Sequence, residues 1–216
     1  MTLSTELKAM TESVRQQVPA EVMATLEAGA ATLLASGVAR NVIKPGDRMP
    51  EFELPDANGV TVRSRDLLVK GPLLLTFYRG SWCPYCNLEL NALQQRLPDI
   101  RARGASLVAI SPQTPDASLT TQMKHDLKFP VLSDAGNKIA RKFGLVFTLD
   151  DGLKKIYDAF GIDLLAHNGD SSLELPVPAT YLIGSDGVVL ASYVNLDYRE
   201  RLEPDVAIGW LDGKGR

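Results

Sequence analysis

The chain has 216 residues, of which 45% are hydrophobic and 23% are charged, and its formal net charge is −3 at pH 7. This composition is typical of a soluble globular protein with one substantial core. The negative balance and the absence of a basic cluster argue against nucleic acid or an anionic membrane as a partner. Because residues 1–10 lack the apolar segment of a secretion signal, we expect a cytoplasmic protein.

Residues 1–40 contain no aromatic side chain and no strand pattern. Apolar residues repeat at helical spacing on both sides of Pro19, first Leu3, Leu7, Met10 and Val14, then Val22, Leu26, Ala30 and Leu33. We therefore predict an N-terminal extension over residues 1–40 that forms a hairpin of two helices. Its apolar faces either pack on the rest of the chain or form the contact of a homodimer.

A second unit, residues 43–216, starts at the turn Pro45-Gly46-Asp47. Its patterns predict an α/β domain, a three-layer α/β/α sandwich around a central mixed sheet, because a strand–helix–strand crossover precedes a terminal strand hairpin. A polar stretch at 167–172 is interpreted as a surface excursion. In chain order we expect a hairpin over 51–62, a helix over 65–69 capped by Ser64, a strand over 73–78, a helix through 86–100, a strand over 106–110, a helix over 116–127, a strand over 130–132, helices over 137–143 and 153–160, strands over 180–183 and 188–194, and a helix from residue 204.

The only two cysteines, Cys83 and Cys86, lie where the apolar strand 73–78 ends and the next helix begins. The first turn of a helix has unpaired N–H groups and the positive end of the helix dipole, so it favours a thiolate. In a Cys-x-x-Cys pair at such a place the pKa can fall to roughly 3.5–7.5. The second sulfur can then resolve a mixed disulfide or sulfenic acid on the first, which predicts a catalytic Cys83–Cys86 disulfide.

Two other interpretations of the pair are weaker. A structural disulfide across so short a loop would constrain the unfolded chain very little. Half of a zinc site would need more N or S ligands, and His125 and His167 are far apart with no ligand spacing. We expect no metal, no cofactor and no role for either histidine.

Residues 43–212 resemble the thioredoxin-like redoxins, in particular the peroxiredoxin-like members of the alkyl hydroperoxide reductase and thiol-specific antioxidant family. The similar segments are GDRMPEFELPD at 46–56, FYRGSWCPYCNLEL at 77–90, Leu132-Ser133-Asp134 and Lys142-Phe143-Gly144. The resemblance implies a thioredoxin-like fold and redox chemistry at the cysteine pair.

The resemblance supports two alignments that name different nucleophiles. In the peroxiredoxin pattern Thr-x-x-Cys-x-x-Glu, Cys86 takes the place of the attacking cysteine and Glu89 that of the glutamate, while Cys83 replaces the threonine. In the thioredoxin pattern Trp-Cys-x-x-Cys, which Trp82 begins, Cys83 is the nucleophile. The sequence leaves this choice open.

Three neighbours of the pair are candidate site residues. Pro178, at the start of a strand, resembles the cis-proline that faces the cysteines of thioredoxins, where many peroxiredoxins carry an arginine; the alternative is a plain edge-strand proline. Arg79 either lowers a thiolate pKa by its charge or faces solvent beyond its strand. Trp82 is interpreted as a packing lid beside the sulfurs, and Glu89 as a solvated residue on the outer face of its helix.

The leading hypothesis is a cytoplasmic thiol-dependent peroxidase that reduces hydrogen peroxide or organic hydroperoxides and takes electrons from thioredoxin or glutathione. The alternatives are a thiol-disulfide oxidoreductase with Cys83 attacking protein disulfides, and a non-catalytic redox switch whose output is the N-terminal helices. No nucleic acid or membrane partner is expected.

Overall fold

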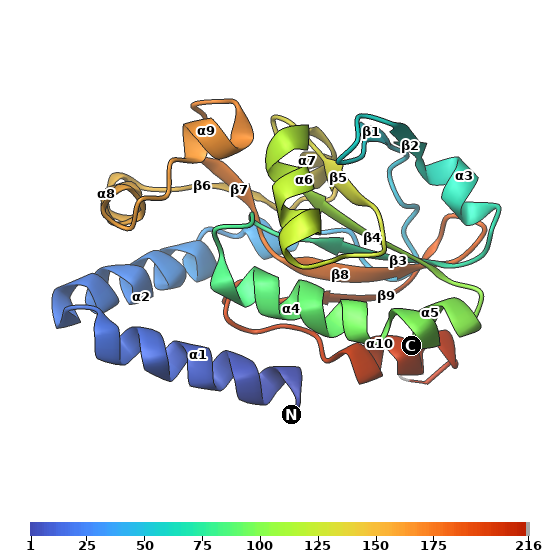
Figure 1. Cartoon of the computed structure of the whole chain (residues 1–216), viewed down its shortest axis with the longest axis horizontal. Helices are drawn as coiled ribbons and strands as arrows, with labels where there is room; N and C mark the ends of the chain where they lie inside the picture. The colour runs from blue at the N-terminus through green and yellow to red at the C-terminus, as the bar shows by residue number, and fades with distance from the viewer. Residues whose placement is uncertain (215–216) are drawn as a thin grey trace.

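The computed structural model describes residues 1–214, and its centre is a five-stranded mixed sheet (Figure 1). The strand order is β5-β4-β3-β8-β9. Strands β3, β4 and β5 are parallel, whereas β8 and β9 run antiparallel to their neighbours. The predicted mixed sheet is therefore confirmed. The strands are β3 (Leu73–Phe77), β4 (Ser106–Ser111), β5 (Val131–Ser133), β8 (Ala179–Ile183) and β9 (Val189–Val194).

Strand β3 is buried throughout and apolar except for Thr76, because helices cover both faces of the sheet. Leu73, Leu75 and Phe77 belong to one core cluster, and Leu74 and Tyr78 belong to the other. Both clusters are fully packed at β3, so the strand can hold the segment that follows it in a fixed position.

Helices α4, α5 and α10 cover one face of the sheet, and α3, α7 and the β1–β2 hairpin cover the other (Figure 1). The single helix expected over 86–100 is two helices that meet at Arg96, because Pro98 has no N–H for the carbonyl of Gln94. The bounds are α3 (Ser64–Leu68), α4 (Pro84–Gln95), α5 (Leu97–Ala102), α6 (Pro115–Lys124), α7 (Lys138–Lys142), α10 (Pro204–Leu211), β1 (Glu53–Pro55) and β2 (Thr61–Arg63).

Residues 146–176 form an excursion from the sheet. Two strands that the sequence did not predict, β6 (Val146–Thr148) and β7 (Glu174–Pro176), pair antiparallel at its base. Between them lie α8 (Asp151–Ala159) and the short helix α9 (Leu164–Asn168). A small apolar cluster that includes Ile156 and Tyr157 holds the excursion together. The excursion thereby places one face of α8 toward the sheet and the N-terminal helices.

The N-terminal hairpin consists of α1 (Leu3–Gln17) and α2 (Ala20–Ala35), followed by the short 3-10 helix η1 (Val38–Arg40). Helix α1 packs along α4 and α2 packs against α8 (Figure 1). Leu3 and Leu7 are buried in the main core, and the backbone N–H groups of Leu3 and Ser4 donate to the carboxylate of Glu203 at 3.2 and 2.6 Å. These contacts attach the N-terminal hairpin to the α/β part of the same chain.

Helix α2 is unusually apolar and approaches its neighbour closely. By length and composition alone, the described stretch Ala20–Arg40 could cross a membrane, with a mean hydropathy of 1.4. Gly29 faces Leu153 of α8, and a Cβ at Gly29 would lie 2.6 Å from the Cδ1 atom of Leu153. The absence of a side chain at Gly29 lets the two helices meet.

Candidate active site

The cysteines lie at the junction of β3 and α4, as the sequence predicts. Gly80 is in the connecting turn, where a Cβ would be 2.4 Å from Nε1 of Trp82, so a side chain would collide with the indole. Gln113 fixes the turn by accepting from the Ser81 N–H at 2.7 Å, and the Asn87 amide donates to the Ser81 carbonyl at 2.8 Å. This turn sets the direction in which the chain enters α4.

Cys83 is the N-cap residue of α4, and Cys86 is in its first turn. Both are free thiols with 0% exposure. The Cys86 thiol donates to the Cys83 sulfur across 2.9 Å. The Cys83 side chain makes no capping hydrogen bond to the helix, so side chains rather than helix amides are its hydrogen-bonding partners.

Arg79 is buried beside Cys83, with only 4% of its surface exposed. Its guanidinium donates to the Cys83 sulfur at 3.2 Å and to the Tyr157 hydroxyl at 2.8 Å. It also lies 4.0 Å from the ring centroid of Tyr198 and 5.0 Å from that of Trp82. Aromatic rings thus surround a cation whose charge faces the sulfur, and the solvent-facing interpretation of Arg79 does not hold.

Arg201 occupies the corresponding place beside Cys86. Its guanidinium donates to the Cys86 sulfur at 3.4 Å and to the Glu89 carboxylate at 2.8 Å. The second oxygen of Glu89 accepts from Thr180 at 3.5 Å, and both ionic side chains are 2% exposed. Glu89 is therefore a buried ion-pair partner, and its interpretation as a solvated residue is wrong.

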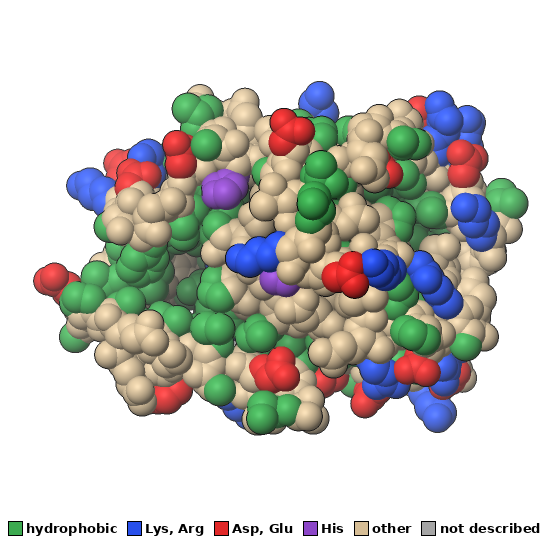
Figure 2. All heavy atoms as spheres, viewed as in Figure 1, with side chains coloured by type: hydrophobic (Ala, Val, Ile, Leu, Met, Phe, Trp, Pro, Cys, Tyr) green, Lys and Arg blue, Asp and Glu red, His purple; other side chains and the backbone are tan. Residues whose placement is uncertain are grey.

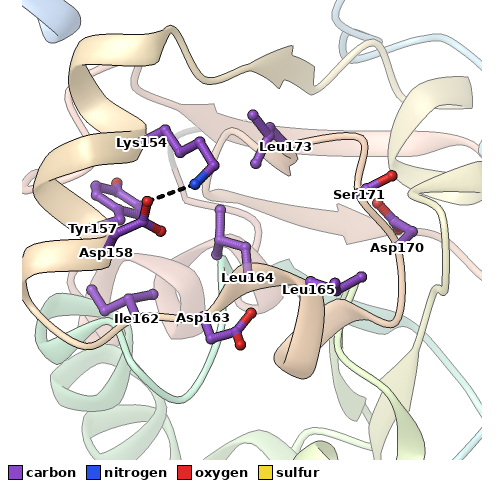
Figure 3. A pocket seen from close by; sticks show the side chains of 10 residues that line it. All are labelled: Lys154, Tyr157, Asp158, Ile162, Asp163, Leu164, Leu165, Asp170, Ser171 and Leu173. Atoms are coloured by element: carbon purple, nitrogen blue, oxygen red, sulfur yellow. Dashed lines mark hydrogen bonds and ion pairs between the residues drawn. The ribbon is translucent and has the colours of Figure 1, made fainter.

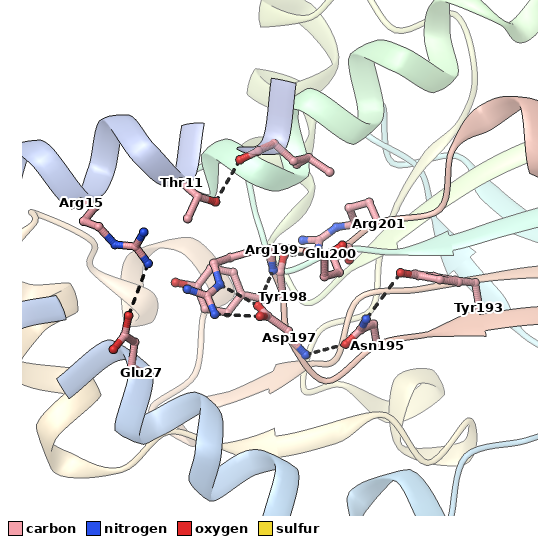
Figure 4. A network of polar contacts seen from close by, with 11 residues as sticks. Thr11, Arg15, Glu27, Tyr193, Asn195, Asp197, Tyr198, Arg199, Glu200 and Arg201 are labelled. Carbon is pink, nitrogen blue, oxygen red and sulfur yellow. Dashed lines mark hydrogen bonds and ion pairs between the residues drawn. The ribbon is translucent and has the colours of Figure 1, made fainter. Parts of the chain in front are cut away.

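The loop after β9 presents Arg201 and Tyr198 to the site (Figure 4). Asp197 pairs with Arg199 at 2.7 Å, and its backbone N–H donates to Asn195 at 2.9 Å. These local contacts occupy Arg199, so Arg201 is the arginine of this loop that contacts a sulfur.

The two sulfurs have opposite ionisation preferences. Burial alone would raise the pKa of Cys83, but the hydrogen bond from Cys86 and the positive charges of Arg79 and Arg201 lower it well below its ordinary value. Burial raises the pKa of Cys86, and the hydrogen bond to Cys83 and the Cys83 charge raise it further. Both shifts favour ionisation of Cys83 before Cys86.

The remaining predicted site residues have less direct positions. Trp82 is half-buried and packs its ring 5.3 Å from that of Tyr157. The peptide bond before Pro178 is trans, as are the other described peptide bonds. The expected cis-proline is thus not found. His125 and His167 are half-buried, away from the contacts described above.

Sequence reasoning missed the roles of Arg201, Tyr157, Tyr198 and Glu89. Glu89 could have been found, because it lies one helical turn after Cys86 on the face that also carries Leu90 and Leu93. The other three come from loops and a helix far away in the sequence, where no local pattern marks them.

Two cavities of similar size lie near α8. One, of about 380 Å³, is lined by residues of α8, α9 and the following loop, including Lys154, Asp163 and Asp170 (Figure 3). The other, of about 370 Å³, is lined by Arg79 and Tyr198 together with the N-terminal hairpin. Tyr157 contributes to both. Of these two cavities, the second is lined by Arg79, which contacts the Cys83 sulfur, so we take it as the approach to the site.

The sheet topology, the strand-to-helix cysteine pair and the buried cation beside it define a peroxiredoxin-like oxidoreductase of thioredoxin fold. The AhpC/TSA family profile matches residues 45–192, well over half of the chain. The chain therefore belongs to the AhpC/TSA family, as its active-site segment led us to expect.

Individual relatives agree with this assignment. The chain is 27% identical over 171 residues to Peroxiredoxin Bcp of Escherichia coli K12, covering 79% of this chain and 97% of the relative. It is 25% identical over 159 residues to Thiol-disulfide oxidoreductase ResA of Bacillus thuringiensis, covering 73% and 74%. The crystal structure of Peroxidoxin BcpB from Mycobacterium tuberculosis superposes with a TM-score of 0.63 at 25% identity, covering 79% and 97%. The N-terminal hairpin lies outside the matched family segment.

Proposed function

We propose that this protein is a thiol-dependent peroxidase in which Cys83 attacks the peroxide and Cys86 resolves the product. One observation carries the assignment of roles: the Cys83 sulfur accepts hydrogen bonds from both Cys86 and Arg79, whereas Cys86 is the donor within the pair. A sulfur that accepts two hydrogen bonds is stabilised as a thiolate, and the thiolate is the nucleophile.

The reaction runs in three steps. The Cys83 thiolate attacks the terminal oxygen of the peroxide, an S–O bond forms, the O–O bond breaks, and the leaving alkoxide takes the proton that Cys83 released on ionising. The Cys86 sulfur, 2.9 Å away, then attacks the sulfenic acid, and water leaves as the disulfide forms. An external thiol donor is oxidised as it returns the pair to two thiols.

Arg79 is the group that acts at the first step. Its buried guanidinium is 3.2 Å from the attacking sulfur, so it also lies close to the oxygen on which negative charge develops. Since water does not screen a charge this deeply buried, its effect on the leaving oxygen is larger than at the surface.

Thioredoxin or glutathione is the proposed electron donor, and the cytoplasm is the proposed location, where such thiols keep cysteines reduced. A homodimer through the N-terminal helices remains a prediction from the sequence. Sedimentation of the reduced and the oxidised protein tests it.

Stopped-flow reduction of hydrogen peroxide by single-cysteine variants tests the proposed roles. Cys83→Ser should abolish the reaction, whereas Cys86→Ser should react and leave a sulfenic acid on Cys83 that dimedone traps. A trapped sulfenic acid on Cys86 in the Cys83→Ser variant would instead assign the attack to Cys86.

A second candidate function is reduction of protein disulfides, favoured by the same order of roles in Trp-Cys-x-x-Cys proteins and by the likeness to ResA. It predicts rapid reduction of insulin disulfides and slow consumption of peroxide. A redox switch predicts turnover of neither substrate but a change in oligomer size on oxidation.

A further inference from the structure

The cavity next to Arg79 has walls from two different parts of the chain. On the hairpin side it is lined by Val14 of α1, Val18 at the C-cap of α1 and Leu26 of α2, and on the side of the main domain by Tyr85, Tyr157 and Tyr198. Arg79 and Phe160, which is partly exposed, also line it. We call this cavity the substrate chamber; it lies between the hairpin and the active site, at the end of the molecule where Figure 2 shows hydrophobic side chains gathered near α2 and α8.

The chamber is much larger than hydrogen peroxide requires. Its volume is about 370 Å³, whereas a water molecule takes up about 30 Å³ of liquid and hydrogen peroxide has only one oxygen atom more. Pockets of about 300–1,000 Å³ with apolar walls and a few converging polar groups are typical of sites for organic ligands. Here the fixed charge is the Arg79 guanidinium, which also contacts the Cys83 sulfur.

The hairpin is held firmly enough to act as a wall. Leu3 and Leu7 anchor α1 in the core, and Glu203 accepts from its first turn. Gly29 brings α2 into contact with α8. The Arg15–Glu27 pair joins the two helices at 3.7 Å (Figure 4), but both side chains are half-exposed, so it contributes at most about 1 kcal/mol and the apolar contacts position the hairpin.

We propose that the α1–α2 hairpin makes this enzyme selective for hydroperoxides with a bulky apolar body, which the substrate chamber binds with the peroxy group toward Arg79 and Cys83. Val14 and Leu26 are then specificity-determining residues from outside the matched family segment. This inference rests on the proposed peroxidase function, and the reaction at Cys83 is the one given above, with the organic alcohol as the leaving product.

Variants that fill the chamber test the inference. In wild-type protein kcat/KM should be at least about tenfold higher for cumene hydroperoxide than for hydrogen peroxide, because apolar contacts in a fitted pocket discriminate on this scale. Leu26→Phe and Val14→Phe should each lower this ratio about tenfold. Leu34→Phe is the matched control, because Leu34 is on the same helix but 60% exposed, and it should leave the ratio unchanged.

A binding measurement separates recognition from chemistry. Calorimetry should detect 2-phenyl-2-propanol, the product alcohol, binding to the reduced wild type and to Leu34→Phe but not to Leu26→Phe. Denaturant unfolding of each variant confirms that it is folded before its result is used, and Val14→Phe serves if Leu26→Phe does not fold.

Three results would overturn the inference. The first is equal wild-type rates with the two peroxides, and the second is an unchanged ratio in the folded chamber variants. The third is that the chamber variants slow only the step in which the thiol donor reduces the disulfide, which would make the chamber a binding site for the donor. Each of these results would leave the proposed peroxidase function intact. Failure of the wild type to reduce either peroxide would instead refute the proposed function itself.

Discussion

Each sulfur of the pair has its own buried arginine, and the surroundings of the two arginines differ. Arg201 forms an ion pair with Glu89, so its charge is shared between a carboxylate and Cys86. Arg79 contacts a tyrosine hydroxyl and aromatic rings, and no described carboxylate lies within ion-pair distance of it. Arg79 therefore has Cys83 as the acceptor of its charge, whereas Arg201 is shared between Cys86 and the Glu89 carboxylate.

The difference between the two arginines explains why the two thiols, whose sulfurs are 2.9 Å apart, lose their protons one after the other. Two thiolates so close would repel each other, and the first proton leaves where the cation is uncompensated. The Arg201–Glu89 pair is a buried neighbour of Cys86, the thiol that stays protonated until the second step.

Breaking the ion pair should have the largest effect. Arg201→Met leaves Glu89 buried without its partner and should lower the free energy of unfolding by about 3–5 kcal/mol at pH 8. Urea unfolding followed by circular dichroism measures it. The double variant with Glu89→Met should recover most of the loss; an unchanged midpoint in Arg201→Met would mean that the pair contributes nothing.

Removing the uncompensated charge should affect reactivity instead. Arg79→Met should raise the pKa of Cys83 by about 1–3 units, so the peroxide reaction slows most at low pH and recovers as the pH rises past the new pKa. At a pH below both pKa values we expect the rate to fall about tenfold for each unit by which the pKa rises. The ultraviolet absorbance of the thiolate gives the pKa directly, and the exposed Arg65→Met is the control. An unchanged thiolate titration would disprove this role.

Glu89 should give the protein a pH-dependent stability. Burial raises the pKa of Glu89 from 4.5 to about 7, with Arg201 opposing the shift. The folded chain therefore holds this proton where the unfolded chain has released it, and this stabilisation is complete below about 4.5 and lost as the pH rises through about 7.

Glu89→Gln removes that dependence. The free energy of unfolding of Glu89→Gln minus that of wild type should rise by about 1–3 kcal/mol as the pH is raised from 5 to 8. This range follows from about 1.4 kcal/mol per pKa unit. The lowered pKa of Cys83 acts in the opposite direction in both proteins, so the difference between the two unfolding curves isolates Glu89. Parallel curves would place the pKa of Glu89 near its ordinary value.

The smallest effect is expected at the aromatic surroundings of Arg79. Tyr157→Phe keeps the ring but removes the hydroxyl that accepts from the guanidinium, which should cost about 1 kcal/mol of stability and slow the peroxide reaction by no more than about fivefold. Tyr193→Phe, whose hydroxyl makes only a 3.5 Å contact, is the control. Equal behaviour of the two variants would show that the Tyr157 hydroxyl does not position Arg79.

Much of the fold follows from local patterns in the sequence. The apolar run at 73–77, the change to helical spacing after it and the terminal hairpin place the cysteines at the centre of a mixed sheet. Strands β6 and β7 were not predicted, because each has three residues and gains its stability from pairing across the excursion.

The site could be predicted only where it is continuous in sequence. Cys83, Cys86 and Arg79 lie within one segment, whereas Arg201 is 115 residues from Cys86 and Tyr157 is 78 residues from Arg79. Burial of a charged residue depends on a partner that packing brings to it, and neither Arg201 nor Glu89 shows that partner in its neighbours along the chain.

The contact between Glu203 and the first turn of α1 links the start of the polypeptide to the loop that carries Arg201, two residues earlier. Deleting the first few residues would expose this carboxylate and free the loop, so a truncated protein would be expected to lose order around Cys86 as well as one helix. For expression and purification, residues 1–4 should therefore be kept, and an affinity tag should be placed away from Leu3 and Ser4.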